Sequence, residues 1–175
     1  MNKNVFLLLD DYAGKVSELT AITQYFHHHL VVQEEDVAEV LERVALEEMR
    51  HLEMLGEALL NADIDPRIYN DKKAYWQGNY VNYQYRVCDI LRADIQAELK
   101  AINQYYQHIT AIEDKNIQIM LRDIIQDELR HIGMFSEKLA KYCPDQKNRS
   151  WLVAEIDKYP LIGRDKEQLI KLLRF

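Results

Sequence analysis

The second half of this chain repeats the first, and the repeat limits the folds that the sequence can adopt. At a constant offset of 80 residues, the segment Glu18–Tyr25 aligns without a gap with the segment Glu98–Tyr105. The same offset places the segment Glu48–His51 on the segment Glu128–His131, and both have the form Glu-x-x-His. The match predicts a fold built from two copies of one unit that are related by a pseudo-twofold axis.

Each copy contains two long segments with helical periodicity. The chain has only 5 glycines and 3 prolines against 48% hydrophobic residues, so it lacks the turn residues that an all-β fold needs. We predict four long helices, over residues 5–31, 35–61, 82–112 and 116–141. The first and third connections are short, whereas residues 62–81 are long enough to cross the length of a bundle. The prediction is an all-α four-helix bundle with one long crossover between its second and third helices.

The chain continues beyond the fourth helix as a short tail. Residues 151–159 and an amphipathic segment over residues 165–175 are separated by Pro160. Asp165 followed by Gln168 is typical of a helix cap. We expect a bundle domain over residues 1–142 and a helical extension over residues 143–175. The extension either docks on the bundle or joins a neighbouring subunit.

Polar residues interrupt the apolar seams of the second and fourth predicted helices at one place each. Positions that step by three and four along a helix share one face. The two seams consist of Val37, Leu41, Val44, Glu48, His51 and Leu55, and of Ile117, Leu121, Ile124, Glu128, His131 and Phe135. The first and third helices place Glu18 and Glu98 on their seams. Each helix therefore delivers one carboxylate to the interior.

Four ionised carboxylates inside a bundle repel one another and lose hydration worth on the order of several kcal/mol each. Two divalent cations balance the four charges, and each cation also finds an imidazole ligand. A single Glu-x-x-His motif is weak evidence, because charged residues are abundant here. Two copies on apolar seams, each with its own upstream glutamate, predict a site for two metal ions. The predicted ligands are Glu18, Glu48, His51, Glu98, Glu128 and His131.

At these residues the sequence resembles the ferritin-like dinuclear carboxylate proteins, specifically the rubrerythrin and manganese-catalase branch, over about residues 12–142. In that family, one glutamate from each of two helices and a Glu-x-x-His from each of the other two surround a metal pair. The resemblance implies a ferritin-like bundle and a cofactor of two iron or two manganese ions. It also implies that Glu48 and Glu128 bridge the two ions.

The sequence departs from rubrerythrins in two places. Their additional helix glutamate is replaced by Ile95, with Asp94 one position away, and their Cys-rich module is absent from this sequence. The departures favour the manganese-catalase-like pattern. They also imply that any electron donor is a separate protein.

Glu47 and Asp127 directly precede the two predicted bridging glutamates. We hypothesise that Glu47 accepts a hydrogen bond from the ring of His131, and Asp127 one from His51, because carboxylates commonly orient the histidine ligands of metals. The alternative is a surface salt bridge with an arginine three residues further on, at position 50 or 130.

Several aromatic and histidine side chains have two interpretations each. Tyr25 and Tyr105 either gate the site or serve as redox bystanders, or they are core tyrosines with hydrogen-bonded hydroxyls. The run His27–His29 is interpreted as surface histidines, because successive helix positions face different ways. The crossover aromatics, among them Trp76 and Tyr80, either pack the crossover on the bundle or form a dimer contact.

The charge and the cysteines exclude several classes of protein. The formal net charge of -7 argues against binding to nucleic acids or to anionic membranes. The apolar run at residues 5–9 is too short for a signal sequence, and no segment is long enough to span a membrane, so we expect a cytoplasmic protein. Cys88 and Cys143 lack the spacing of a thiolate metal site and are predicted to be free thiols.

The leading functional hypothesis is an oxidoreductase in which paired iron or manganese ions act on hydrogen peroxide or dioxygen. Its partners would be this small oxidant, a separate electron-donor protein and further copies of the chain, in a homodimer or larger homo-oligomer. One alternative is a ferroxidase that stores iron, as bacterioferritin does. The other alternative is a metal-free helical interaction bundle.

Overall fold

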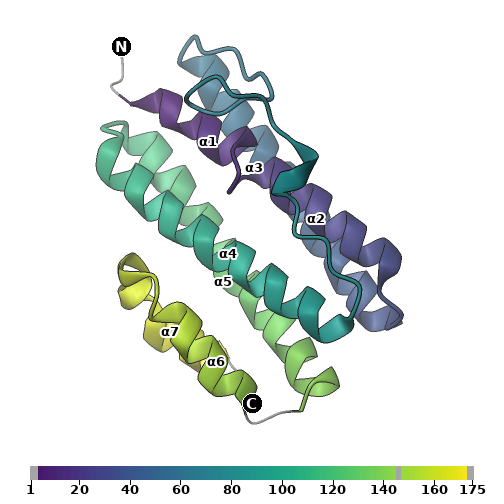
Figure 1. Cartoon of the computed structure of the whole chain (residues 1–175). Coiled ribbons are helices and arrows are strands. Elements are labelled where there is room, and N and C mark those ends of the chain that lie inside the picture. Colours follow the sequence, from purple (N-terminus) through teal and green to yellow (C-terminus); the bar gives the residue numbers. More distant parts are fainter. Residues whose placement is uncertain (1–3, 145–146, 173–175) are drawn as a thin grey trace.

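Four long helices form the body of the computed structural model, which describes residues 4–144 and 147–172 (Figure 1). They are α2 (Glu18–Val31), α3 (Glu35–Asn61), α4 (Val87–Ala111) and α5 (Lys115–Tyr142). The shorter elements are α1 (Leu8–Ala13), α6 (Lys147–Ile156), α7 (Lys166–Leu172) and the 3-10 helices η1 (Val5–Leu7), η2 (Gly78–Tyr80) and η3 (Pro160–Arg164). The predicted all-α class is confirmed. Within the described residues, no helix has both the length and the apolar character that crossing a membrane requires.

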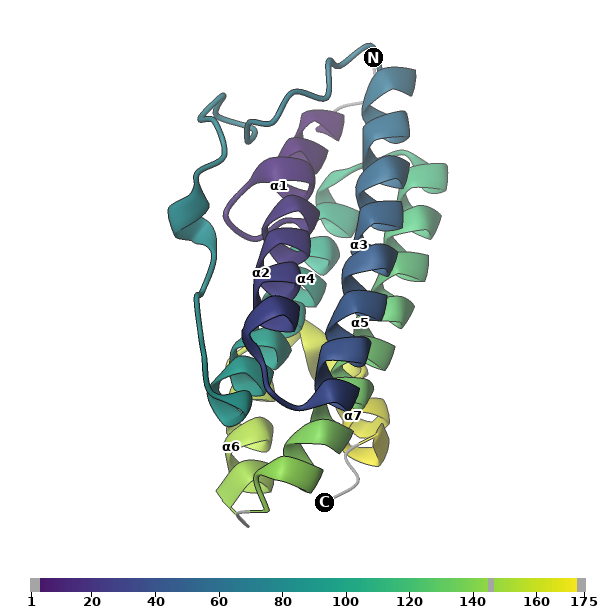
Figure 2. The same cartoon turned by 90° about the vertical axis from the view of Figure 1, so that its right-hand side faces the viewer.

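The long helices pack mainly as two hairpins, α2 with α3 and α4 with α5. Figure 2 shows the segment between α3 and α4 running along the outside of the bundle from one end to the other. The ferritin-like bundle with one long crossover is therefore confirmed. Helix α4 begins five residues later than predicted, because residues 82–86 still belong to the crossover. The backbone N–H of Asn82 donates to Gln24 Oε1 over 3.0 Å, which ties this end of the crossover to α2.

The predicted seams of α3 and α5 face the interior. Every one of their twelve residues is buried, and none is more than 8% exposed. On α4, Glu98, Ile102 and Tyr105 are buried as well, whereas Ile22 on α2 is only partly buried. The apolar residues above and below the polar positions close the two ends of the bundle core. The polar residues are thereby held at mid-height between the four helices.

The prediction of one continuous helix over residues 5–31 is wrong, because the helix is interrupted between Ala13 and Glu18. Gly14 ends α1 in an extended conformation, and its N–H donates to the carbonyl of Asp10 over 2.9 Å. Ser17 then caps α2, since its hydroxyl oxygen accepts a hydrogen bond from the N–H of Thr20 over 3.2 Å. The break makes Glu18 the first residue of α2, which fixes the height of this carboxylate in the bundle.

Replacing Gly14 with alanine is expected to destabilise the fold by about 1–3 kcal/mol, the usual cost of overpacking a buried position. A Cβ at this position would lie 2.5 Å from the carbonyl oxygen of Asp10, which is backbone and cannot move aside cheaply. Gly163→Ala is the matched control, because a Cβ there meets nothing within 4 Å. Urea unfolding of both variants measures the difference, and equal midpoints would contradict this account of the break.

The tail folds back onto its own bundle rather than leaving it. Leu152 and Ile156 of α6, Ile162 of η3 and Leu169 of α7 are buried and join the hydrophobic core. Figure 1 shows this C-terminal part lying against α4 and α5. Docking on the bundle is therefore the arrangement that the described residues adopt. The end of the predicted segment 165–175 lies outside the described residues.

The prediction of two free thiols is wrong, because Cys88 and Cys143 form a disulfide. Cys88 lies in the first turn of α4 and Cys143 directly follows α5, so residues 55 positions apart in sequence meet with their Cα atoms 6.0 Å apart. The antiparallel pairing of these two helices brings the residues together. Spacing along the sequence does not reveal this contact.

The prediction of surface histidines is wrong for His28, which is completely buried. Its Nδ1 lies 2.8 Å from Asp94 Oδ1, and its Nε2 lies 2.9 Å from the carbonyl oxygen of Asn82. Gln24 Nε2 also donates to Asp94 Oδ1, over 2.9 Å. Asp94 is therefore occupied by the α2 side chains that hold the crossover. His108, the counterpart of His28 in the repeat, makes the corresponding buried pair with Asp11 in α1.

Candidate metal centre

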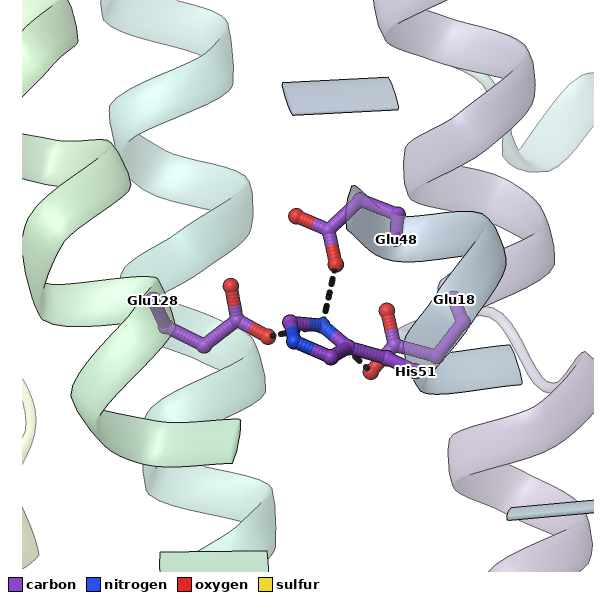
Figure 3. A group of neighbouring side chains, drawn as sticks. All are labelled: Glu18, Glu48, His51 and Glu128. Carbon is purple, nitrogen blue, oxygen red and sulfur yellow. Dashed lines mark hydrogen bonds and ion pairs between the residues drawn. The ribbon is translucent and has the colours of Figure 1, made fainter. Parts of the chain in front are cut away.

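Side chains from all four long helices meet at one buried cluster in the middle of the bundle. Figure 3 shows four of them, Glu18, Glu48, His51 and Glu128. α2 supplies Glu18, α3 supplies Glu48 and His51, α4 supplies Glu98, and α5 supplies Glu128 and His131. None of the six side chains belongs to a residue that is more than 2% exposed. The structure thus brings together all six residues that the repeat singled out. The cluster inherits the pseudo-twofold symmetry of the sequence.

The cluster divides into two groups that can each hold a metal ion. One group consists of Glu18, Glu48, His51 and Glu128, and the other of Glu48, Glu98, Glu128 and His131. Within each group, one potential ligand atom per residue lies within 4.8 Å of all the others. Glu48 and Glu128 belong to both groups. These two carboxylates therefore lie between the two positions, and the remaining four ligands are divided evenly, with one glutamate and one histidine at each position.

The two histidines turn the same ring nitrogen toward the carboxylates. His51 Nδ1 lies 2.8 Å from Glu48 Oε2 and 3.4 Å from Glu128 Oε1, and Figure 3 shows the ring between these side chains. His131 Nδ1 lies 3.0 Å from Glu128 Oε2 and 3.5 Å from Glu98 Oε1. The Nδ1 atoms of both rings are thus the nitrogens available to a metal ion.

The other nitrogen of each ring contacts a carboxylate of the opposite copy. His131 Nε2 lies 2.8 Å from Glu47 Oε2, and His51 Nε2 lies 3.2 Å from Asp127 Oδ2. Arg130 also donates to both carboxylates, over 2.6 Å to Glu47 and 2.7 Å to Asp127. Both alternatives from the sequence therefore hold for Asp127, which contacts His51 and also Arg130 three residues further on. Glu47 contacts His131 as hypothesised, but its salt bridge is with Arg130 of the opposite copy and not with the arginine three residues further on. Sequence reasoning did not anticipate that one arginine bridges both carboxylates.

These contacts keep the outer carboxylates ionised. Hydrogen bonding to His131, and then to Arg130, lowers the pKa of Glu47 to about 2 despite its partial burial. Burial opposes ionisation of Asp127, but hydrogen bonds from Arg130 and His51 lower its pKa as well. An ionised carboxylate at Nε2 keeps the proton on that nitrogen, so Nδ1 faces the cluster with its lone pair when the ring is neutral. The outer residues thereby fix both the tautomer and the direction of each ring.

Without a metal ion, burial and repulsion between neighbouring carboxylates disfavour the ionised forms of Glu18 and Glu98. Burial, and then the charges of Glu48 and Glu128, raise the pKa of Glu18 well above its usual range. Burial and the same two charges raise the pKa of Glu98 in the same way. Burial opposes protonation of His51, but hydrogen bonds to Glu128 and Glu48 raise its pKa to about 11. In the absence of metal, protons on Glu18, Glu98 and His51 therefore offset the negative charge of the cluster.

Two buried oxygens of the cluster are left without a well-aligned hydrogen bond. Glu48 Oε1 and Glu98 Oε1 are buried and make no well-aligned hydrogen bond among the described residues, although His131 Nδ1 lies 3.0 Å from the first and 3.5 Å from the second. Buried polar atoms are rarely left in this state unless an ion or water satisfies them. Carboxylate oxygens with one imidazole per position are donors that suit manganese and iron. The residues present therefore fit a metal centre.

The two tyrosines of the repeat differ in their contacts. The hydroxyl of Tyr105 donates to Glu18 Oε1, as expected of a core tyrosine with a hydrogen-bonded hydroxyl. Tyr25 is also completely buried and packs edge-on against Phe135, with ring centroids 5.5 Å apart. Its hydroxyl has no partner among the described residues, so the expectation of a hydrogen-bonded hydroxyl is wrong for this tyrosine.

Sequence reasoning missed the buried residues that tie the crossover to the helices beside the cluster. His28, Gln24 and Asp94 form this connection, and they lie about one to three turns from Glu18 and Glu98 along their helices. A signal was present in the sequence, because the repeat aligns His28 with His108. Two histidines kept at equivalent positions on two helices indicate a shared structural task.

Comparison with known proteins agrees with this geometry. A manganese catalase from Anabaena, KatB, superimposes with a TM-score of 0.74 and 26% sequence identity, covering 78% of this chain and 71% of that one. Bacterioferritin from Mycobacterium leprae is 29% identical over 130 residues, which are 71% of this chain and 77% of that protein. The encapsulin nanocompartment cargo protein EncC of Myxococcus xanthus is 33% identical over 72 residues, or 41% of this chain.

The chain spans about half the length of EncC, since the match covers 54% of that protein. The family model described as a ferritin-like domain matches residues 16–142 of this chain, which include all six residues of the buried cluster. The four-helix bundle, the long crossover and this match lead to one conclusion. The chain belongs to the ferritin-like domain family.

Proposed function

We propose that this protein binds two iron or two manganese ions and is an oxidoreductase that acts on hydrogen peroxide or dioxygen. The observation that carries the proposal is the pair of buried ligand groups that share Glu48 and Glu128. Glu18 and His51 complete one position, and Glu98 and His131 complete the other. The likeness to manganese catalases supports peroxide as the substrate.

The ions would supply the redox chemistry, because two adjacent ions can share the two-electron change that cleavage of an O–O bond requires. The chain supplies the geometry. Glu47 and Asp127 hold the two histidine rings, and Tyr105 holds Glu18 through its hydroxyl. The apolar seams above and below the cluster close the two ends of the bundle to water. Metal binding would release the protons of the inner carboxylates, and the ionised carboxylates would then balance the charge of the ions.

The proposal is tested on protein purified without chelators. Elemental analysis is expected to find about two ions of iron or manganese per chain, by analogy with the ligand count of such bundles. Addition of hydrogen peroxide is then expected to release oxygen, measured with an oxygen electrode, and the chelated protein is expected to release none. A fully loaded protein that neither decomposes peroxide nor consumes dioxygen with a reductant would contradict the proposed activity.

A second candidate function is oxidation and storage of iron, and the match to bacterioferritin favours it. The match to an encapsulin cargo protein adds an encapsulin shell as a candidate partner for storage. Storage requires a hollow assembly or a separate container for the mineral. Native mass spectrometry and the iron content per chain separate the functions. A dimer with about two ions fits the oxidoreductase, whereas a large hollow assembly holding many iron atoms per chain fits storage.

A further inference from the structure

A pocket of about 350 Å³ leads from the surface between α2 and α4 to the carboxylate cluster. Its inner end is formed by Glu18, Glu98 and Glu128, which belong to the candidate metal centre. All the other residues of the cluster lie outside its lining. The pocket therefore reaches the centre from one side only, the side of α2 and α4.

Small side chains leave the space between these two helices open. Ala93, Ala97 and Ala101 follow one another at steps of four along α4, and Ala21 lines the pocket from α2. Steps of four lie on one face of a helix, so the three alanines form one wall. Larger side chains at these positions would fill the pocket and separate the cluster from solvent.

The crossover covers part of the pocket. Tyr80 of η2 and Asn82 belong to its lining, and Asn82 is held at both backbone polar groups. Its N–H donates to Gln24 Oε1 over 3.0 Å, and its carbonyl oxygen lies 2.9 Å from His28 Nε2. The buried pair of His28 and Asp94 thus keeps the cover of the pocket in place.

One buried donor in the lining has no partner. The hydroxyl of Tyr25 makes no hydrogen bond among the described residues, although the side chain is completely buried. Its counterpart Tyr105 uses its hydroxyl to hold Glu18. A buried hydroxyl without an acceptor costs free energy, so a molecule that accepts its hydrogen bond would gain affinity.

We propose that this pocket is the access route to the metal centre for a small oxygen-bearing molecule of the peroxide class, and that Tyr25 positions this molecule by donating a hydrogen bond to it. The inference rests on the proposed function. The volume excludes bulky substrates, and the exposed lysines Lys15 and Lys100 in the lining favour the approach of small anions. Azide is the probe of choice, because it is a small anion that accepts hydrogen bonds.

The test measures azide binding to cobalt-loaded protein by stopped-flow absorption, a readout that does not depend on turnover. Ala97→Leu and Ala101→Leu are expected to slow azide association by about 10-fold or more, since both fill the pocket. Ala140→Leu is the matched control, because Ala140 is a partly buried helix alanine outside the pocket. Tyr25→Phe is expected to raise the azide dissociation constant by about 5- to 10-fold, the usual effect of losing one hydrogen bond.

Each variant is first loaded overnight and its cobalt content is measured, because a filled pocket also slows the arrival of the metal. Fully loaded Ala97→Leu and Ala101→Leu proteins that bind azide at the rate of the Ala140→Leu control would overturn the access route. An unchanged azide dissociation constant in Tyr25→Phe would overturn the role of the hydroxyl. In both cases the proposed function stands, whereas a native chain that takes up no cobalt overturns the proposed function and this inference together.

Discussion

Replacing Glu48 with glutamine is expected to lower the affinity of the protein for iron or manganese by more than about 100-fold, the upper range seen when an outer carboxylate of a metal site is lost. Glu48 belongs to both ligand groups, so its loss weakens both positions at once. Glutamine keeps the size of the side chain and removes its charge. Elemental analysis of the purified variant, followed by titration with the metal, measures the change.

The matched control is Glu53→Gln, which removes one carboxylate from the exposed face of the same helix. This control is expected to bind metal as the native protein does. The Glu48→Gln variant is expected to remain folded, because glutamine fills the same volume and its amide oxygen can still accept a hydrogen bond from His51. Native metal content in a folded Glu48→Gln protein would contradict the assignment of this residue.

Removal of the metal is expected to make the stability of the protein fall with rising pH. In the metal-free protein, the pKa of His51 is raised to about 11 and the pKa of His131 is raised as well. The stability that each raised pKa contributes is complete below the ordinary pKa of 6.5 and is lost as the pH rises toward the native value. In this window, the free energy of unfolding falls by about 1.4 kcal/mol per pH unit for each histidine that is protonated in the folded protein but not in the unfolded chain.

The carboxylates do not reverse this trend. The pKa values of Glu18 and Glu98 are raised too, so their contributions are also lost as the pH rises. Burial opposes a lower pKa for Glu48, but hydrogen bonds from His131 and His51 prevail and lower it. Its contribution is therefore present above the ordinary value of 4.5 and is lost only in acid. Bound metal replaces the protons, so the stability of the loaded protein is expected to stay level above pH 7.

Urea unfolding of loaded and metal-free protein at pH 7 and pH 9 measures this difference. We expect the metal-free protein to lose about 3 kcal/mol between these two values for each histidine that keeps its proton, and the loaded protein to lose little. His108, whose pKa is raised by Asp11 against the effect of burial, contributes equally to both forms and cancels in the comparison. Parallel profiles for the two forms would show that the cluster does not exchange protons for metal.

The arrangement of the bundle could be predicted because several independent patterns in the sequence agree. The bounds of the second predicted helix match α3, and those of the fourth match α5 within one residue at each end. The seam residues of both helices are buried as predicted, because a helix with one apolar face packs with that face toward the core. The six cluster residues meet because the repeat places them at equal heights on four helices.

The break in the first helix was predictable in principle. Gly14 followed by Ser17 is a pair of stop and start signals, but the apolar periodicity on both sides conceals the break. Asp94 illustrates a different limit. Its position next to Ile95 suggests a relation to the metal ligands, whereas its actual partner is His28 on another helix. Which of several nearby polar groups forms a pair depends on side-chain direction across helices.

The disulfide and the access pocket could not be predicted from residue spacing. The contact between Cys88 and Cys143 depends on which ends of α4 and α5 lie side by side. The pocket depends on alanines of two helices that face each other across a gap. Alanines are common in helices, so their sequence positions alone do not indicate a cavity.

Anomalous diffraction from crystals of the native protein, recorded at the manganese and iron absorption edges, locates any metal ions in the bundle. We predict two peaks in the middle of the bundle, one beside His51 and one beside His131, with Glu48 and Glu128 between them. Bundle centres that give no peak at either edge, in crystals of protein that was never exposed to a chelator, would contradict this prediction. Peaks located away from these side chains would contradict it as well.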